Sequence, residues 1–392
     1  MRKEKDMKHP LIVILFLFLN SSVSHSQVPI DFPSKTLIDL YGNLYVSGFN
    51  SSFDIETQKF SESGTLMWKK DHVNAGFDKP FDLVLDSVGN PYVTGYKHNA
   101  GHNLNELFIL KHINNEQGRI EYVHTLNNNL ESTGFGVVKH DSATFICGYV
   151  TGITNKDLII IKFNRLGDTL WTRTYNNPAY NKDDVATDIL IDGDNLYVIG
   201  YTYNGPFRKN DIIHMILDFD GNVSSTLILN GKGRNETPTG FVIAQITDVP
   251  HLQKSRTAAV VISDDPFGGS GSTMLTYYFK GDIVNELLWR SQYNSLPGST
   301  NIPAAIAADN SGNVFVTGYT NNRNRSNYDF VTMKYKKQDG TPGWNNPSHL
   351  YYDSLNGNDK ASSVKVSGNR LYVAGTSDST QYGYYIAGYN QI

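Results

Sequence analysis

The sequence predicts an all-β protein, a seven-bladed β-propeller of four-stranded antiparallel blades. Two observations support this prediction. One short strand motif returns at intervals of roughly 50 residues, and each interval holds four strand-like segments with no long helical periodicity. Units of this size with four strands are typical of propeller blades, whereas parallel β-helices use shorter repeats. The composition agrees, because 12% aromatic and 18% charged residues are typical of an ordered β protein.

The recurring motif is Tyr-Val-Thr-Gly-Tyr or a close variant. Its glycine lies at Gly48, Gly95, Gly148, Gly200, Gly318 and Gly375. The interval between the fourth and the fifth of these glycines is about twice as long as the others. A weaker copy of the motif at 257–263 divides it. We therefore count seven repeats, of which the fifth (241–289) is the most divergent.

Each repeat divides into four segments, a to d. Segment a is a short apolar run, and a tight turn, often Gly-Asn, leads to segment b, which is the recurring motif. Segment c opens with an acidic residue in most repeats, and a glycine turn leads to segment d. All four tryptophans fall at one position of segment d, which Tyr122 occupies in the second repeat: Trp68, Trp171, Trp289 and Trp344. The aromatic position of segment d and the glycine of segment b both recur in the repeats. We therefore predict that the aromatic side chain packs between blades and that the glycine allows neighbouring backbone to approach closely.

The first 26 residues have the features of a secretory signal peptide. A basic stretch precedes the apolar run Leu11–Leu19, and small residues at Ser24 and Ser26 form a cleavage site. The apolar run is too short to span a bilayer, which needs about 20 residues. We predict export to the periplasm or the medium, with residues 27–392 forming a single propeller domain. Cys147, the only cysteine, cannot form an internal disulfide.

The net charge of the chain is −4, and removal of residues 1–26 makes it −6, since they carry four basic and two acidic residues. This balance argues against a nucleic-acid or anionic-membrane partner, because such binding depends on neutralising phosphates. No other stretch is apolar enough to span a membrane. We predict a monomer without a cofactor.

The last repeat predicts how the ring closes. The sequence ends at Tyr384–Tyr389, a segment c, so the seventh blade lacks its segment d. Val28–Phe32 precedes the first segment a, and we predict that it supplies the missing outer strand. Pro29 is acceptable there because an edge strand tolerates proline.

At these motifs the chain resembles the bacterial β-propeller repeat family called SBBP. Ala305–Thr320 is similar to the first half of that repeat, with Asp-x-x-Gly-Asn-Val-Phe-Val-Thr-Gly-Tyr-Thr, and Asp157–Trp171 is similar to the second half. The resemblance covers residues 34–392. It implies a propeller fold and an exported or cell-envelope protein, and it brings no catalytic residues.

The loops of the predicted blades indicate where a function could lie. The a–b and c–d turns are tight, while the longer b–c and d–a connections gather on one face. Binding residues concentrate on loops held by a rigid scaffold. On this long-loop face we predict binding residues of the types that recognise proteins or glycans: Tyr203, Arg208, Arg323, Arg325 and Tyr328. The partner is predicted to be a protein or a cell-surface glycan.

Three chemical patterns in the sequence favour plain structural roles. His98 and His102 share one loop, but two ligands do not define a metal site. Asp218–Asn222 begins like a calcium loop but lacks the later glycine and glutamate, which favours a plain turn. Acidic residues that end segment a, such as Asp86 and Asp309, or open segment c could form rings around a channel. Their recurrence favours turn and backbone hydrogen bonding.

The sequence also lacks a catalytic motif. It shows no Ser-His-Asp spacing and no phosphate-binding glycine loop. We therefore predict a non-enzymatic binding protein. The alternative is a polysaccharide lyase or hydrolase with its site at the mouth of the central channel. A cluster of charged residues that does not repeat from blade to blade would favour this alternative.

Overall fold

The computed structural model describes residues 13–14, 32–114, 117–126, 130–152, 154–244, 256–264, 271–281, 285–296, 298–321, 327–344, 349–352, 357–367, 370–377 and 383–390. The regular structure in these ranges consists of β-strands only, and they contain no helix that could cross a membrane. The strands form antiparallel four-stranded sheets, as a propeller requires. The chain divides into two compact units, residues 19–233 and residues 1–18 with 234–392. We call them the four-sheet unit and the three-sheet unit.

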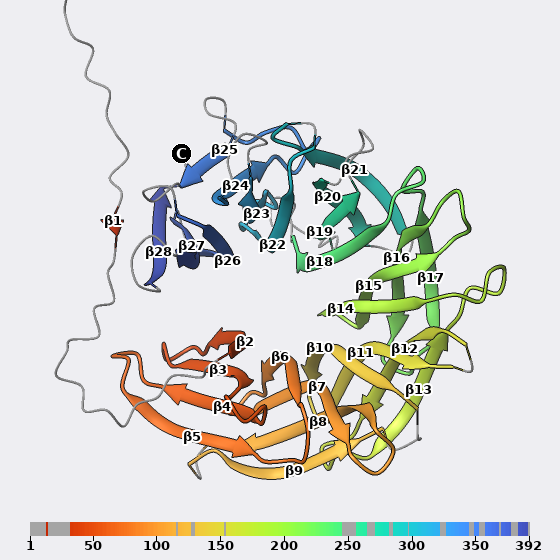
Figure 1. The fold of residues 1–392 in the computed structure, drawn as a ribbon, viewed down its shortest axis with the longest axis vertical. Helices are drawn as coiled ribbons and strands as arrows, with labels where there is room; N and C mark the ends of the chain where they lie inside the picture. The colour runs from red at the N-terminus through yellow and green to blue at the C-terminus, as the bar shows by residue number, and fades with distance from the viewer. Residues whose placement is uncertain are drawn as a thin grey trace, which may run out of the picture. The chain divides into compact units, whose positions relative to one another are not determined.

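The four-sheet unit holds the first four repeats. Its strands, sheet by sheet, are β2 (Phe32–Ile38), β3 (Leu44–Phe49), β4 (Ile55–Phe60) and β5 (Leu66–His72); β6 (Lys79–Leu85), β7 (Pro91–Asn99), β8 (Leu104–Ile113) and β9 (Arg119–Thr125); β10 (Ser132–His140), β11 (Ala143–Thr151), β12 (Lys156–Phe163) and β13 (Thr169–Tyr175); β14 (Asp184–Asp192), β15 (Asn195–Tyr203), β16 (Asn210–Asp218) and β17 (Val223–Leu229). In Figure 1 these sheets fan out, with β2, β6, β10 and β14 along the inner side of the fan.

The three-sheet unit holds the remaining repeats. Its strands are β18 (Glu236–Ile243), β19 (Arg256–Asp264), β20 (Ser272–Gly281) and β21 (Asn285–Tyr293); β22 (Asn301–Ala308), β23 (Val314–Thr320), β24 (Asp329–Tyr335) and β25 (His349–Tyr352); β26 (Asp359–Ser367), β27 (Arg370–Ser377), β28 (Gly383–Asn390) and β1 (Val13–Ile14). The divergent fifth repeat therefore still forms a complete sheet.

The hydrophobic core lies between successive sheets. Strands b and c bury nearly every side chain, as in β11 and β12 of the third sheet, because this sheet packs on a neighbour through both faces. Cys147 lies in one such layer together with Ile160 and Val198 of neighbouring strands. Its thiol is free, and burial raises its pKa well above the usual range. The sheets thus depend on each other for burial, as propeller blades do.

The ring of strand d packs against the next sheet, as predicted. Trp171 donates its indole N–H to the carbonyl oxygen of Phe219, in the c–d turn of the following sheet, at 3.1 Å. Gly221 of that turn has φ +81°, and a Cβ on it would lie 3.2 Å from the Trp171 ring. Gly118 and Gly167 receive Trp68 and Tyr122 in the same way.

The motif glycine of strand b faces a bulge in strand a. In every sheet the pairing of the first two strands shifts by one residue at this level, for example between Gly134 and Gly136. A Cβ on Gly148 would lie 1.8 Å from the carbonyl oxygen of Thr133. This close approach explains the recurring glycine, as predicted, although the fifth sheet has Val261 at the equivalent position beside its own bulge.

The predicted closing strand, Val28–Phe32, lies outside the described residues except for its last residue, which belongs to strand a of the first sheet. That residue, Phe32, belongs to β2 and pairs with Phe49. The edge of β28 pairs instead with β1, through Val13↔Gly388 and Ile14↔Ala387.

Candidate functional site

The bulge in strand a gives each sheet two adjacent side chains on its inner strand. β-Bulges redirect side chains and are common beside active sites. In the four-sheet unit the first bulge residues are Ser34, Phe81, Phe135 and Thr187, and the second are Lys35, Asp82, Gly136 and Asp188. The backbone repeats from sheet to sheet at this level, but the side chains do not. This makes the bulge the place where the sheets differ chemically.

Three of the second bulge residues form a charged cluster, Lys35, Asp82 and Asp188. The Lys35 ammonium lies 2.7 Å from Asp82 Oδ1, and Asp82 Oδ2 accepts the backbone N–H of Val137 at 2.9 Å. Asp188 Oδ1 accepts the N–H of Ile189. The cluster thus draws its members from the first, second and fourth sheets.

Gly136 makes room for this cluster in the third sheet. A Cβ on Gly136 would lie 3.2 Å from Asp188 Oδ1, so the carboxylate occupies the space that a side chain would take. Burial raises the pKa of Asp188 to about 7, with Lys35 opposing the shift and Asp82 adding to it. The Asp82 carboxylate keeps the pKa of Lys35 above its usual range. The cluster therefore combines a firmly protonated amine with a carboxyl group that binds a proton near neutral pH.

Two of the first bulge residues, Phe81 and Phe135, belong to an aromatic row along the same end of the unit. We define the aromatic row as Phe49, Phe53, Phe77, Tyr96, Phe81, Phe135 and Tyr149. Neighbouring ring centroids in it are 4.9 to 6.4 Å apart. Phe53 lies in a b–c loop and Phe77 in a d–a loop, and these rings are 48% and 39% exposed. Phe81 and Phe135 are half-buried. The row therefore runs from the long loops to the bulges.

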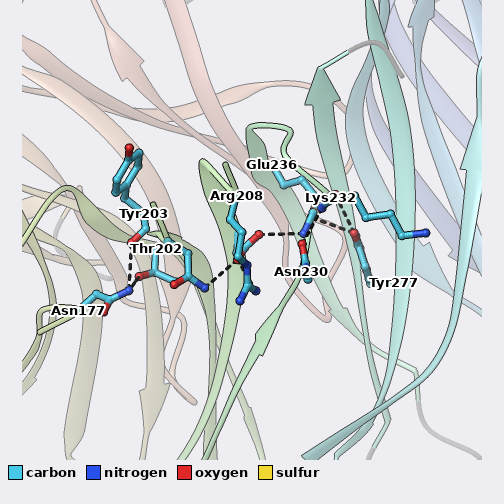
Figure 2. Close-up of polar contacts among 11 residues, drawn as sticks. Asn177, Thr202, Tyr203, Arg208, Asn230, Lys232, Glu236 and Tyr277 are labelled. Atoms are coloured by element: carbon cyan, nitrogen blue, oxygen red, sulfur yellow. Dashed lines mark hydrogen bonds and ion pairs between the residues drawn. The ribbon is translucent and has the colours of Figure 1, made fainter. Parts of the chain in front are cut away.

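The structure places three of the five predicted binding residues, in two units. In the four-sheet unit, Tyr203 ends β15 and its ring contacts Tyr180 edge-on. Figure 2 shows Asn177 bridging to the carbonyl oxygen of Tyr203 and the hydroxyl of Thr202. In the three-sheet unit, the ring of Tyr328 contacts that of Tyr319 at 5.2 Å.

Arg208 is engaged by a buried partner. Its guanidinium lies 2.6 Å from Asp211 Oδ2, and Asp211 is fully buried. The buried carboxylate needs a positive charge nearby, which holds Arg208 in place. Arg323 and Arg325 lie outside the described residues. None of the predicted residues belongs to the charged cluster or the aromatic row.

The recurring acidic residues have local roles. Asp86 Oδ1 accepts the N–H groups of Val88 and Asn90, and Asp309 closes its turn in the same way. Asp218 does so in the segment that resembles a calcium loop. These contacts confirm the predicted turn role.

The acidic residues at the other ends of the strands include the buried Asp184 and the half-buried Asp157. Asp184 Oδ2 accepts the N–H of Asn177, while Oδ1 is buried without a hydrogen-bond partner among the described residues. Burial raises the pKa of Asp184 to about 6, and Asp157 contributes to the shift. Ionisation of Asp184 is therefore less favourable in the folded protein than in the unfolded chain.

We expect Asp184→Asn to stabilise the protein at pH 7 by about 1 to 2 kcal/mol, since it removes a carboxylate whose ionisation is disfavoured by burial. A raised folded-state pKa makes the wild type lose stability as the pH rises from about 4 to 6. The gain should therefore vanish at pH 4. Urea melts at both pH values measure it, with the exposed Asp183→Asn as the control. An equal effect at both pH values would contradict the assignment.

One repeat of the chain matches a known family. Residues 288–324 match the family model described as a beta-propeller repeat, SBBP. The chain carries an SBBP repeat. The match includes β23 and confirms the resemblance seen in the sequence. No curated protein matches this SBBP-repeat chain in sequence.

Two solved structures are similar to the SBBP-repeat chain. One is polysaccharide lyase Uly1, at 11% identity and TM-score 0.53, with 95% of this chain and 94% of that chain covered. The other is a puromycin hydrolase mutant complexed with PGG, at 12% identity and TM-score 0.51, with 92% and 54% covered. The chain spans about half the length of the second protein. Likeness at this identity shows the fold alone.

The prediction that the SBBP-repeat chain is not an enzyme is corrected by this comparison. Both similar structures are of enzymes. The prediction rested on the absence of sequence motifs, and such motifs reveal only sites whose residues have a regular local spacing. The cluster of Lys35, Asp82 and Asp188 is assembled from three sheets, so no local spacing reveals it.

Sequence reasoning missed this cluster although a signal was present. Each member lies four residues before the end of segment a, as in Asp82 to Asp86 and Asp188 to Asp192. The sixth repeat has Ala305 at this position. Charges that replace a small apolar residue in some repeats mark a position used for something other than the fold.

Proposed function

We propose that this protein binds a glycan along the aromatic row of the four-sheet unit. The observation that supports the proposal is the continuity of the row, from the loop rings of Phe53 and Phe77 to the bulge rings of Phe81 and Phe135. One face of a sugar ring carries mostly C–H groups and packs on flat aromatic rings, while its hydroxyl groups bond polar neighbours. Polar groups lie beside the row as well: the hydroxyl of Tyr149 donates a hydrogen bond to the carboxylate of Glu131 at 2.9 Å.

The wider setting is part of the same proposal. Seven sheets would close into one seven-bladed ring in residues 27–392. The protein would be exported after removal of residues 1–26, which include β1, so the mature seventh sheet would keep β26, β27 and β28. Mass spectrometry of the protein from the periplasm and the medium of an expressing cell tests the cleavage. An intact N-terminus in every fraction would contradict it.

Replacement of Phe81 and Phe135 tests the glycan site. We expect Phe81→Leu/Phe135→Leu to weaken polysaccharide binding at least tenfold, because leucine retains apolar bulk without the flat face, and loss of one aromatic anchor often costs about 2 kcal/mol. Affinity electrophoresis against a panel of soluble polysaccharides measures the loss. Tyr41→Ala is the control, since Tyr41 is 82% exposed in an a–b turn at the opposite ends of the strands.

Unchanged binding by the folded double variant would overturn the proposed site. Circular dichroism melts of both variants show whether they fold. A polysaccharide that is bound by no form of the protein would count against the glycan function itself.

A second candidate function is cleavage of the bound glycan. The charged cluster favours it, because a carboxyl group that holds its proton near pH 7 can donate that proton to a departing glycosidic oxygen. Asp188 is the candidate donor. Asp188→Asn should abolish the release of new chain ends from a cleaved polysaccharide while binding is retained. Release at the wild-type rate would exclude Asp188 from the reaction.

A further inference from the structure

Three lysines lie on aromatic rings at the loop ends of the strands. Lys79 Nζ is 4.9 Å from the centroid of Phe81, and Lys156 Nζ is 4.1 Å from that of Tyr149, so both lie on the aromatic row. In the three-sheet unit, Lys360 Nζ is 5.1 Å from the centroid of Tyr328 and 5.5 Å from that of Tyr319. Lys79 and Lys360 are equivalent, since each follows the buried aspartate that opens strand a.

These lysines differ from those at the turn ends of the strands. Most turn-end lysines that lie over rings donate to a protein acceptor, whereas Lys334, 5.3 Å from the centroid of Phe315, has none among the described residues. Lys59 donates to Asn114, Lys111 pairs with Glu121, and Lys162 donates to the carbonyl oxygen of Phe219. Within the described ranges, Lys79, Lys156 and Lys360 have no carboxylate within 4.0 Å and no hydrogen bond from Nζ. Their ammonium groups lie over the rings, and their N–H groups can donate hydrogen bonds to another molecule.

We propose that the glycan bound along the aromatic row is anionic, a polymer that bears carboxylate or sulfate groups, and that Lys79 and Lys156 pair with these groups. This inference rests on the proposed glycan function. Tyr149 is buried, so Lys156 contributes only its charge, while Lys79 places its positive charge beside Phe81, which is half-buried and keeps part of its surface for a sugar. Acidic substituents of a stacked sugar would then meet a donor that no protein group has taken.

The whole protein favours a glycan over a nucleic acid as the polyanion. The chain has 34 basic and 38 acidic residues, so its net charge repels a densely charged backbone. The row itself carries lysine only over Phe81 and Tyr149, two of its seven rings. Sparse positive charge suits a polymer with one acidic group per sugar or fewer.

The test compares polymers of matched size by isothermal titration calorimetry at low and at physiological salt. The probes are polygalacturonate, which carries carboxylates, dextran sulfate, neutral dextran and oligo-dT. We expect the full chain to bind one or both acidic polysaccharides at least tenfold more tightly than dextran. Lys79→Gln/Lys156→Gln should reduce that binding about tenfold and make it insensitive to salt, since each exposed pair contributes up to about 1 kcal/mol. Lys79→Arg should retain it.

Lys336→Gln is the matched control, because Lys336 is an exposed lysine in a c–d turn. Preference for carboxylate or for sulfate would each support the inference and would identify the acidic group. Equal binding to dextran, or full binding by the double lysine variant, would overturn it. Tighter binding to oligo-dT would also overturn it. The glycan proposal fails separately, if Phe81→Leu/Phe135→Leu binds every polymer as the wild type does.

Discussion

Gly148→Ala should lower the free energy of unfolding by roughly 3 to 4 kcal/mol, a cost reached only when backbone or core must move. The new Cβ would lie 1.8 Å from the carbonyl oxygen of Thr133, and this oxygen belongs to strand β10 beside its bulge. Neither backbone can retreat, because both strands are packed between sheets. The loss should appear in urea melts as a lower midpoint with an unchanged slope.

Gly152→Ala provides the control for this prediction. Gly152 lies one residue beyond β11, and a Cβ there would meet nothing nearer than Asp157 Oδ2 at 3.3 Å. Alanine also reduces the freedom of the unfolded chain, so this variant should be neutral or slightly more stable. If Gly148→Ala proved as stable as the control, the bulge would not require glycine.

Lys35→Met should destabilise the protein by about 2 kcal/mol at pH 7, since it leaves the buried Asp82 carboxylate without its positive partner. The full cost of a broken buried pair is larger, but the Lys35 side chain is 46% exposed and water partly replaces it. Methionine keeps most of the apolar stem, so the effect reports charge and not packing.

The pH dependence of Lys35→Met follows from the same carboxylates. Without the ammonium, nothing offsets the repulsion of Asp188 by Asp82, and the pKa of Asp188 rises further in the folded protein. The variant should therefore lose stability as the pH rises from 4 to 7 and approach the wild type at pH 4. Lys35→Met/Asp82→Asn should recover most of the loss at pH 7, because asparagine still accepts the N–H of Val137. A pH-independent deficit would show that the charge is not the cause.

The repeat made most of the fold predictable from the sequence. One motif per repeat placed strand b, and the position of Trp171 or Tyr122 in strand d predicted the contact with the next sheet. These features are shared by the repeats, so comparing one repeat with another reveals them. The fold also depends on them, because each sheet buries its faces only against its neighbours.

The candidate site was less predictable for the same reason. Its residues differ from one repeat to the next, as Asp82, Gly136 and Asp188 do at one equivalent position. A search for what the repeats share does not detect such residues. The predicted loop residue Arg208 was chosen for its residue type, but the buried Asp211 was not foreseen as its partner. Burial of a charge depends on strand pairing and is not visible in a loop sequence.

The packing of each strand-d ring on the glycine of the next c–d turn has a consequence for the history of such chains. Trp171 provides the ring, and Gly221 in the following repeat provides the space that the ring fills. Duplication or loss of one whole repeat leaves every ring facing a glycine turn, wherever in the repeat the inserted or deleted segment begins. Insertion of part of a repeat leaves a ring without a glycine turn to pack on, or a glycine turn without a ring. Genes for these proteins can therefore grow and shrink in whole repeats, while the two bulge positions, which contact one another between sheets, change together.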